Sequence, residues 1–191
     1  MSTNNNAVEL EKVVIKFAGD SGDGMQLTGT QFTDTSALLG NDLATFPDYP
    51  AEIRAPIGTV AGVSGFQVHI GKVEINTPGD TANVLVAMNP AALKANQRWI
   101  KDGGTIIVNS DSFTKKDLDK AGYEESPLED GTFDAYNVVS APITSLTRET
   151  LADSGLDGKS IGRSKNMFAL GMVYWMFNRP MEQTEKFLKE K

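Results

Sequence analysis

A glycine-rich turn between a predicted strand and a predicted helix constrains the fold of this chain most strongly. Residues 12–18, KVVIKFA, form a β-branched, apolar run of the kind found in strands buried on both faces of a sheet. The run ends in the sequence GDSGDG at residues 19–24, and residues 25–39 then show helical spacing of apolar and small side chains. The small residues Gly29 and Ser36 predict that this helix lies close against a sheet.

Strand and helix patterns alternate along the rest of the chain. The predicted strands are 12–18, 43–46, 65–71, 83–88, 105–109 and 135–140. The predicted helices are 25–39, 90–100, 113–121, 143–152, 160–177 and 180–191, with Ser160 as an N-cap. This order predicts an α/β fold: a three-layer α/β/α Rossmann-like domain with right-handed crossovers.

One part of the pattern predicts antiparallel pairing. In residues 65–71, Phe66, Val68 and Ile70 alternate with Gln67 and His69, so His69 faces the polar side of a strand. The following Gly-Lys pair is typical of a two-residue turn, which predicts a hairpin whose second strand is 73–76. We therefore expect a mostly parallel, partly mixed sheet.

Composition excludes several classes of function. The 191 residues include no Cys and one His, which rules out thiolate zinc sites, cysteine nucleophiles, resident iron–sulfur clusters and His-rich metal sites. A formal net charge of −7 argues against nucleic acid as a partner. The longest apolar run, 167–177, is shorter than the ~20 residues of a membrane-spanning helix, so we expect no membrane partner. The N-terminus resembles no secretory signal, which predicts a cytoplasmic protein.

The glycine loop is the first candidate site. Backbone N–H groups beside a helix N-terminus suit an anion, yet a dinucleotide fingerprint would need glycine where Leu27 stands. A phosphate loop would need Lys and Ser or Thr where Met25 and Gln26 stand. Asp20 and Asp23 would repel phosphate, but they suit helix capping or hydroxyl and amide donors. Ligand contact and a tight structural turn therefore both remain open.

Two further features indicate function. Residues 46–65 contain several prolines and glycines and predict a long ordered loop, in which Glu52 and Arg54 share one strand-like face. Arg54 suits a carboxylate or phosphate, and a local ion pair with Glu52 is the alternative. The apolar helix around residues 167–176 carries an excess of Met and Trp, which is typical of core or subunit-interface packing and predicts a partner.

Four stretches together resemble the 2-oxoacid:ferredoxin oxidoreductases: KVVIKFAGDSGDGM at 12–25, YPAEIRAPIG at 49–58, VSGFQ at 63–67 and KNMFALG at 165–171. The resemblance covers nearly the whole chain. It is to the gamma-type domain at the N-terminus of the fused alpha subunit, and most of all to the 2-oxoglutarate enzymes. By this resemblance, residues 1–11 are a flexible N-terminus and 12–178 the gamma-type domain. Residues 179–191 are a C-terminal helix and the start of a linker to a catalytic domain.

The resemblance implies an enzyme that uses thiamine diphosphate to decarboxylate a 2-oxoacid, passes electrons through iron–sulfur clusters to ferredoxin and transfers the acyl group to coenzyme A. It implies that this chain is non-catalytic, holds no metal, helps to bind coenzyme A, and packs on the catalytic alpha domain and the beta subunit. Thiamine diphosphate and the clusters would lie in those other parts. The residues carried over as coenzyme A or interface contacts are Gly19, Asp20, Ser21, Gly22, Asp23, Gly24, Glu52 and Arg54.

Two alternatives stand beside this interpretation. The chain is an independent nucleotide- or coenzyme A-binding module, or it is a purely structural assembly domain. Its charged end, EKFLKEK at residues 185–191, is more typical of a cut within a helix than of a natural C-terminus, although a separate gamma-type subunit is the other explanation.

Overall fold

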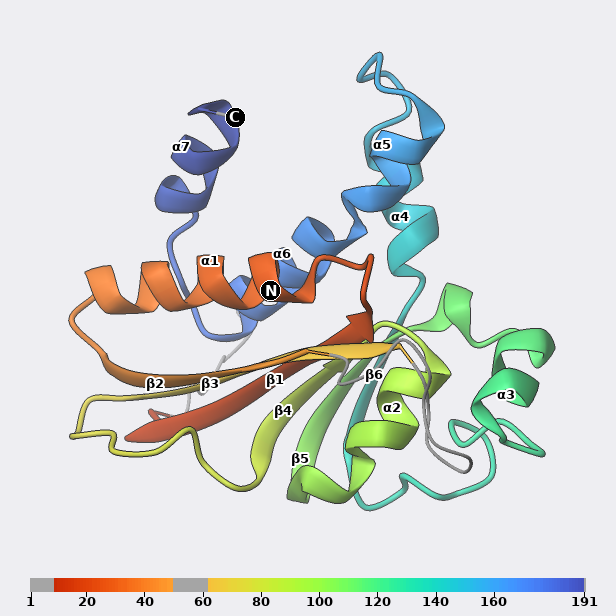
Figure 1. Ribbon diagram of the computed structural model, residues 1–191, viewed down its shortest axis with the longest axis horizontal. Coiled ribbons are helices and arrows are strands. Elements are labelled where there is room, and N and C mark those ends of the chain that lie inside the picture. The colour runs from red at the N-terminus through yellow and green to blue at the C-terminus, as the bar shows by residue number, and fades with distance from the viewer. Residues whose placement is uncertain (1–8, 50–61, 191) are drawn as a thin grey trace, which may run out of the picture.

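The computed structural model describes residues 9–49 and 62–190 and shows one six-stranded sheet in the order β2-β3-β1-β4-β5-β6 (Figure 1). The strands are β1 (Lys12–Asp20), β2 (Asp42–Asp48), β3 (Val63–Gly71), β4 (Ala82–Ala87), β5 (Ile100–Asn109) and β6 (Asn137–Ala141). β1, β4, β5 and β6 pair in parallel, whereas β3 pairs antiparallel with both β1 and β2. The predicted mixed, mostly parallel sheet is confirmed.

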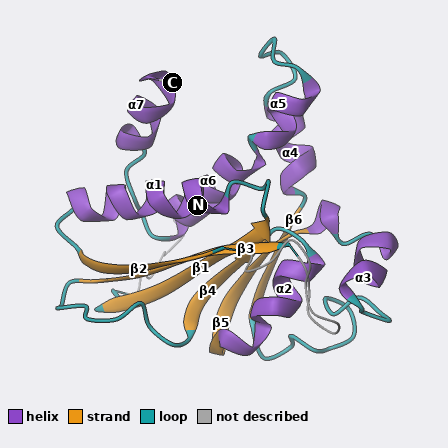
Figure 2. Ribbon diagram, viewed as in Figure 1, coloured by secondary structure: helices purple, strands orange, loops and turns teal. Residues whose placement is uncertain are grey.

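Helices cover both faces of this sheet (Figure 2). The α-helices are α1 (Met25–Leu38), α2 (Pro90–Asn96), α3 (Lys115–Ala121), α4 (Ile143–Thr150), α5 (Gly158–Arg163), α6 (Lys165–Met176) and α7 (Glu182–Glu190). α1 and α6 lie on one face and α2 and α3 on the other (Figure 2). The three-layer α/β/α prediction therefore holds. Among the described residues, no helix has the length and apolar character that crossing a membrane requires.

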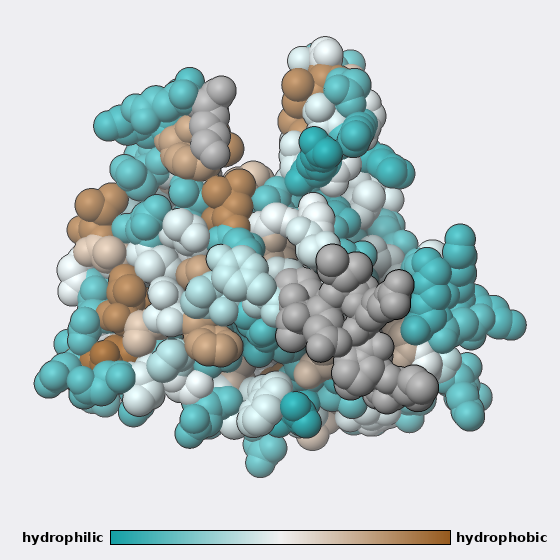
Figure 3. Space-filling view, viewed as in Figure 1, coloured by the Kyte–Doolittle hydropathy of each residue, from teal (hydrophilic) through white to brown (hydrophobic). Residues whose placement is uncertain are grey.

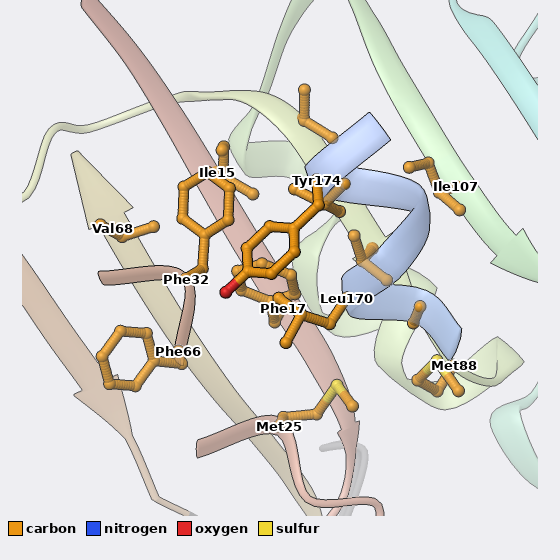
Figure 4. Close-up of a cluster of buried hydrophobic side chains, with 14 of the residues drawn as sticks. Ile15, Phe17, Met25, Phe32, Phe66, Val68, Met88, Ile107, Leu170 and Tyr174 are labelled. Carbon is orange, nitrogen blue, oxygen red and sulfur yellow. The ribbon is translucent and has the colours of Figure 1, made fainter. Parts of the chain in front are cut away.

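The hydrophobic core has two clusters, one on each face of the sheet, because successive strand residues point to opposite sides. The larger cluster is centred on Phe32 of α1, which is fully buried and packs against the rings of Phe17 and Tyr174 (Figure 4). The ring of Phe177 also packs against Phe32. A Cβ atom at position 29 would overlap the ring of Phe66. The prediction that a small residue there lets α1 lie close to the sheet is confirmed.

A buried hydroxyl cluster joins the three helices above this core. The Tyr174 hydroxyl of α6 donates to the carbonyl of Gln31 at 2.9 Å. The same hydroxyl lies 2.9 Å from the Thr35 hydroxyl of α1 and 2.8 Å from the Thr184 hydroxyl of α7. Since buried polar groups are stable only when they are paired, these bonds fix how α1, α6 and α7 sit relative to one another.

The predicted hairpin with a second strand at 73–76 is wrong. Both edges of β3 are already occupied by β1 and β2, so no free edge remains for another strand. The chain instead passes beside β3, where the Gln67 amide donates to the carbonyl of Pro78 at 2.9 Å. The His69 Nδ1 atom lies 2.7 Å from the carbonyl oxygen of Thr77, so His69 holds this connection and its role is structural.

Two predicted helices differ from the structure by more than a shift of one or two residues at an end. The 160–177 helix is divided at Ser164, whose hydroxyl donates to the carbonyl of Ser160 at 3.0 Å, and such back-bonding bends helices. Its N-cap is Asp157 rather than Ser160, because the Asp157 carboxylate accepts from the backbone N–H of Ser160 at 2.9 Å. The 90–100 helix ends at Asn96, and a short 3₁₀ turn leads directly into β5.

Candidate functional site

The glycine loop begins where β1 ends, and its backbone turns tightly into α1. The N–H of Asp23 donates to the carbonyl of Asp20 at 2.9 Å, and the Asp23 carboxylate accepts from the N–H of Asp20 at 3.0 Å. Gly24, the N-cap of α1, has φ +72°, a left-handed conformation that favours glycine. Gly19 is buried, whereas Ser21 and Gly22 are exposed at the tip of the turn.

This loop lies at the point where the chain connections diverge. From β1 the chain passes through α1 to β2 on one side of the sheet, and from β4 it passes through α2 to β5 on the other side. In open α/β sheets, ligands bind outside the carboxyl ends of strands at such a switch point. A cavity of about 170 Å³ lies there. Its lining residues are Asp20, Asp23, Met88, Asn89, Pro90, Ala91, Ser112, Asp117, Lys120 and Lys165.

The N-terminus of α6 packs against the glycine loop. The Lys165 ammonium forms an ion pair with the Asp23 carboxylate at 2.7 Å, and both side chains are largely buried. The amide of Asn166 lies so close to Gly24 that a Cβ atom there would overlap it. The KNMFALG stretch and the glycine loop, 140 residues apart in sequence, therefore form one structural unit (Figure 1). Reasoning from the sequence alone did not identify Lys165 or Asn166 as its members.

Asn89, which follows β4, contributes the other side of the cavity. Its side-chain oxygen caps α2 by accepting from the N–H of Ala92 at 2.8 Å, and its amide donates to the Asp20 carboxylate at 2.8 Å. Burial raises the pKa of Asp20, and the negative charge of Asp23 adds to this rise, while the hydrogen bond from Asn89 opposes it. Sequence reasoning missed Asn89, although an Asn-Pro pair directly after a predicted strand is a signal that could have pointed to it.

A prediction on pH follows from Asp20. The pKa of Asp20 is higher in the folded than in the unfolded chain. The folded protein therefore loses stability as pH rises from the unfolded pKa to the folded pKa, and the whole of this loss is present at pH 7. Asp20→Asn should therefore raise Tm slightly at pH 7 and leave Tm unchanged at low pH, where the Asp20 carboxyl is protonated in both the folded and the unfolded chain. Thermal melts across pH measure this, with Asp34→Asn on the exposed side of α1 as the control. A lower Tm for Asp20→Asn at pH 7 would contradict the assignment.

The site has donors for a ligand that accepts hydrogen bonds. Helix geometry leaves the N–H groups of Met25, Gln26 and Leu27 without helical partners, since the first bond of α1 runs from Thr28 to the carbonyl of Gly24. Gly24 has no side chain that could cap them. The charge of Asp23 is balanced by Lys165, and that of Asp117 by Lys120 at 3.5 Å. The uncapped first turn of α1 thus follows directly on Asp23, a residue of the cavity wall, and the wall itself has near-balanced side-chain charge.

The eight residues predicted for the site fall into two groups. The structure brings Asp20 and Asp23 together in the cavity wall, with Gly19, Ser21, Gly22 and Gly24 forming the turn beside it. Glu52 and Arg54 lie outside the described residues, as does most of the predicted 46–65 loop. Both ends of the predicted loop belong to strands, because β2 extends to Asp48 and β3 begins at Val63.

Comparison with known proteins identifies one family over most of the chain. The family model for pyruvate ferredoxin/flavodoxin oxidoreductase matches residues 14–191. The 2-oxoglutarate oxidoreductase subunit KorA of Mycobacterium tuberculosis is 57% identical over 182 residues, which cover 95% of this chain and 28% of KorA. The common gamma subunit of the pyruvate/ketoisovalerate oxidoreductases of Thermococcus litoralis is 26% identical, over 71% of this chain and 73% of that subunit.

Solved structures show the same fold in two settings. A 2-oxoglutarate:ferredoxin oxidoreductase from Magnetococcus marinus, with 2-oxoglutarate, coenzyme A and succinyl-CoA bound, matches with a TM-score of 0.70 and 26% identity, over 96% of this chain and 28% of that chain. The gamma subunit of a keto/oxoacid ferredoxin oxidoreductase from Geobacter sulfurreducens matches with a TM-score of 0.64 and 21% identity, over 92% of this chain and 82% of that chain. The chain therefore belongs to the pyruvate ferredoxin/flavodoxin oxidoreductase family, as its sequence motifs predicted.

Proposed function

We propose that this chain is the non-catalytic gamma-type part of a 2-oxoacid:ferredoxin oxidoreductase, with 2-oxoglutarate as the substrate of the whole enzyme, and that it contributes to coenzyme A binding and to assembly. The observation that carries the proposal is the cavity at the β1/β4 switch point, which Lys120 and Lys165 line and whose wall includes Asp23, the residue before the uncapped N-terminus of α1. The KorA relative and the coenzyme A-bound Magnetococcus enzyme support the choice of substrate and ligand.

The size of the cavity favours a shared site over an independent binding module. Pockets that hold a drug-sized ligand measure roughly 300–1,000 Å³. The cavity at the glycine loop measures about 170 Å³, which is room for one group of coenzyme A rather than for the whole molecule. The remaining contacts must then come from other parts of the enzyme.

The donors and acceptors suggest which groups of coenzyme A meet this surface. Phosphate oxygens suit the free N–H groups of the first turn of α1. Asp20 and Asn89 suit hydroxyl and amide groups, because a carboxylate accepts hydrogen bonds and an amide both donates and accepts. Thiamine diphosphate and the iron–sulfur clusters belong, in this proposal, to the catalytic alpha domain, the beta subunit and their partners. A chain without cysteine has no thiolate for a cluster.

The proposal predicts a selective effect of Lys120→Met in the complete oxidoreductase. Loss of the ammonium removes a cation from the cavity and leaves Asp117 uncompensated, so the KM for coenzyme A should rise about fivefold to tenfold. The kcat and the KM for the 2-oxoacid should stay unchanged, because the contact is equal in the ground and transition states. Steady-state kinetics with each substrate varied in turn measures this.

Lys116→Met is the matched control, since Lys116 is an exposed residue of the same helix α3 and does not line the cavity. Its kinetic constants should equal those of the unchanged enzyme. An unaltered KM for coenzyme A in Lys120→Met, in an enzyme that is fully assembled, would overturn the ligand role and leave assembly as the function of the chain.

A further inference from the structure

Helix α6 and the adjoining strands form an apolar groove. Its volume is about 420 Å³. It is lined by Ile107 of β5, Val139 of β6 and, from α6, Phe168, Gly171, Met172, Trp175 and Met176. None of these residues carries a charge, although the chain has a net charge of −7. We call this surface the α6 groove.

α6 is apolar on its outer as well as its inner side. Its inner residues Ala169, Leu170 and Val173 are buried in the core, as expected for a helix that covers a sheet. On its outer side, Trp175 is 81% exposed. α1, which packs beside α6, instead presents Thr30 and Asp34 to solvent. A helix that is apolar all round is typical of a buried position, which α6 does not have within this chain.

Trp175 is the most exposed of the large apolar side chains in the described residues, although others such as Leu38 and Tyr49 are also exposed. In the view of Figure 3, hydrophobic residues lie in several places among hydrophilic ones. Large exposed apolar patches on a folded domain mark interaction sites. Tryptophan is enriched among the residues that contribute most to interfaces, and methionine adapts its shape to a partner.

We infer that the α6 groove docks an uncharged, aliphatic and aromatic surface of the remaining part of the same oxidoreductase; this inference rests on the proposed function. This chain covers 28% of the Magnetococcus chain, so in that enzyme the fold is one part of a longer chain. It covers 82% of the Geobacter gamma subunit, so there the fold makes up most of a separate chain. A separate gamma subunit is not covalently joined to the rest of its enzyme, so contacts at its surface must hold it there. The uncharged lining of the α6 groove has the chemistry for that contact.

Side-chain oxidation by hydroxyl radicals tests this inference. Since both core clusters form within this chain and a gamma subunit of the same fold is a separate chain, residues 1–191 can be compared with the complete enzyme. Trp175 and Met172 should oxidise at least about tenfold more slowly in the complete enzyme than in the isolated chain. Trp99, the other tryptophan and 41% exposed, lies outside the groove and is the internal reference.

A variant gives the second arm. Trp175→Glu should weaken association of the separately supplied chain with the rest of the enzyme by about tenfold or more, measured by sedimentation. Trp99→Glu should leave association unchanged, and both isolated variants should keep the native Tm. Equal oxidation of Trp175 in both samples, or unaltered association of Trp175→Glu, would overturn the assignment. Protection of Trp175 that grows with the concentration of the isolated chain would assign the groove to a second copy instead. If Lys120→Met still raised the KM for coenzyme A as predicted, the proposed function would stand even where these results overturned the role of the α6 groove.

Discussion

Phe32→Ala should lower the free energy of unfolding by about 3–5 kcal/mol, the largest stability effect expected for a single substitution in this chain. Phe32 is fully buried between β1 and α6, with ring centroids 6.1 Å from Phe17 and 5.9 Å from Tyr174. Its truncation leaves a cavity that these rigid neighbours cannot fill (Figure 4). For a domain of this size we expect a fall in Tm of roughly 6–20 °C, measured by circular dichroism or calorimetry.

Phe46→Ala separates this packing effect from a general loss of aromatic area. Phe46 lies on the edge strand β2 and is 52% exposed, so its truncation should change Tm by only a few degrees. If both variants melted at the same temperature, α1 and α6 would not be held to the sheet through Phe32, and the described core would be incorrect.

Gly24→Ala should be the most damaging substitution in the glycine loop, at about 2–4 kcal/mol. The left-handed φ of +72° disfavours any Cβ atom, and a Cβ at this position would also overlap the amide of Asn166. Movement of Asn166 would displace the neighbouring Lys165 from Asp23 and so disturb the loop. We expect a lower Tm together with a raised KM for coenzyme A in the complete enzyme.

Gly22→Ala is the control within the same loop, because a Cβ atom at position 22 would meet no atom within 4 Å. It should melt close to the unchanged protein. The double variant Gly24→Ala with Asn166→Gly should recover the stability lost through overlap with the Asn166 side chain. It should not recover the stability lost because alanine disfavours the left-handed backbone. No recovery in the double variant would show that contact with Asn166 is not what makes glycine necessary at position 24.

The sequence predicted the layers of this fold because its signals are local. A β-branched run such as 12–18 and the helical spacing that follows it depend on neighbouring residues, and both appear where they were expected. The predicted hairpin was wrong for the opposite reason. Whether residues 73–76 form a strand depends on which edges of β3 are free, and β1 and β2, which are distant in sequence, decide that.

Only the part of the candidate site that is local in sequence was predicted. The glycine loop was recognisable from its own residues, and the structure places it at the switch point of the sheet. Its partners Asn89, Lys120 and Lys165 come from three other elements, and only the folded chain brings them together. The excess of apolar residues on α6 was visible in the sequence, but which of them face outward depends on how α6 packs against α1 and the sheet.

Hydrogen–deuterium exchange of the complete oxidoreductase, with and without saturating coenzyme A, tests the central claim most directly. If the first turn of α1 binds the ligand, the backbone amides of residues 21–27 should exchange more slowly when coenzyme A is present, because their N–H groups then have acceptors. The connection at residues 72–76, which is remote from the cavity, should not change. Unaltered exchange at residues 21–27 in an enzyme that binds and turns over coenzyme A would contradict a role for this chain in holding that ligand.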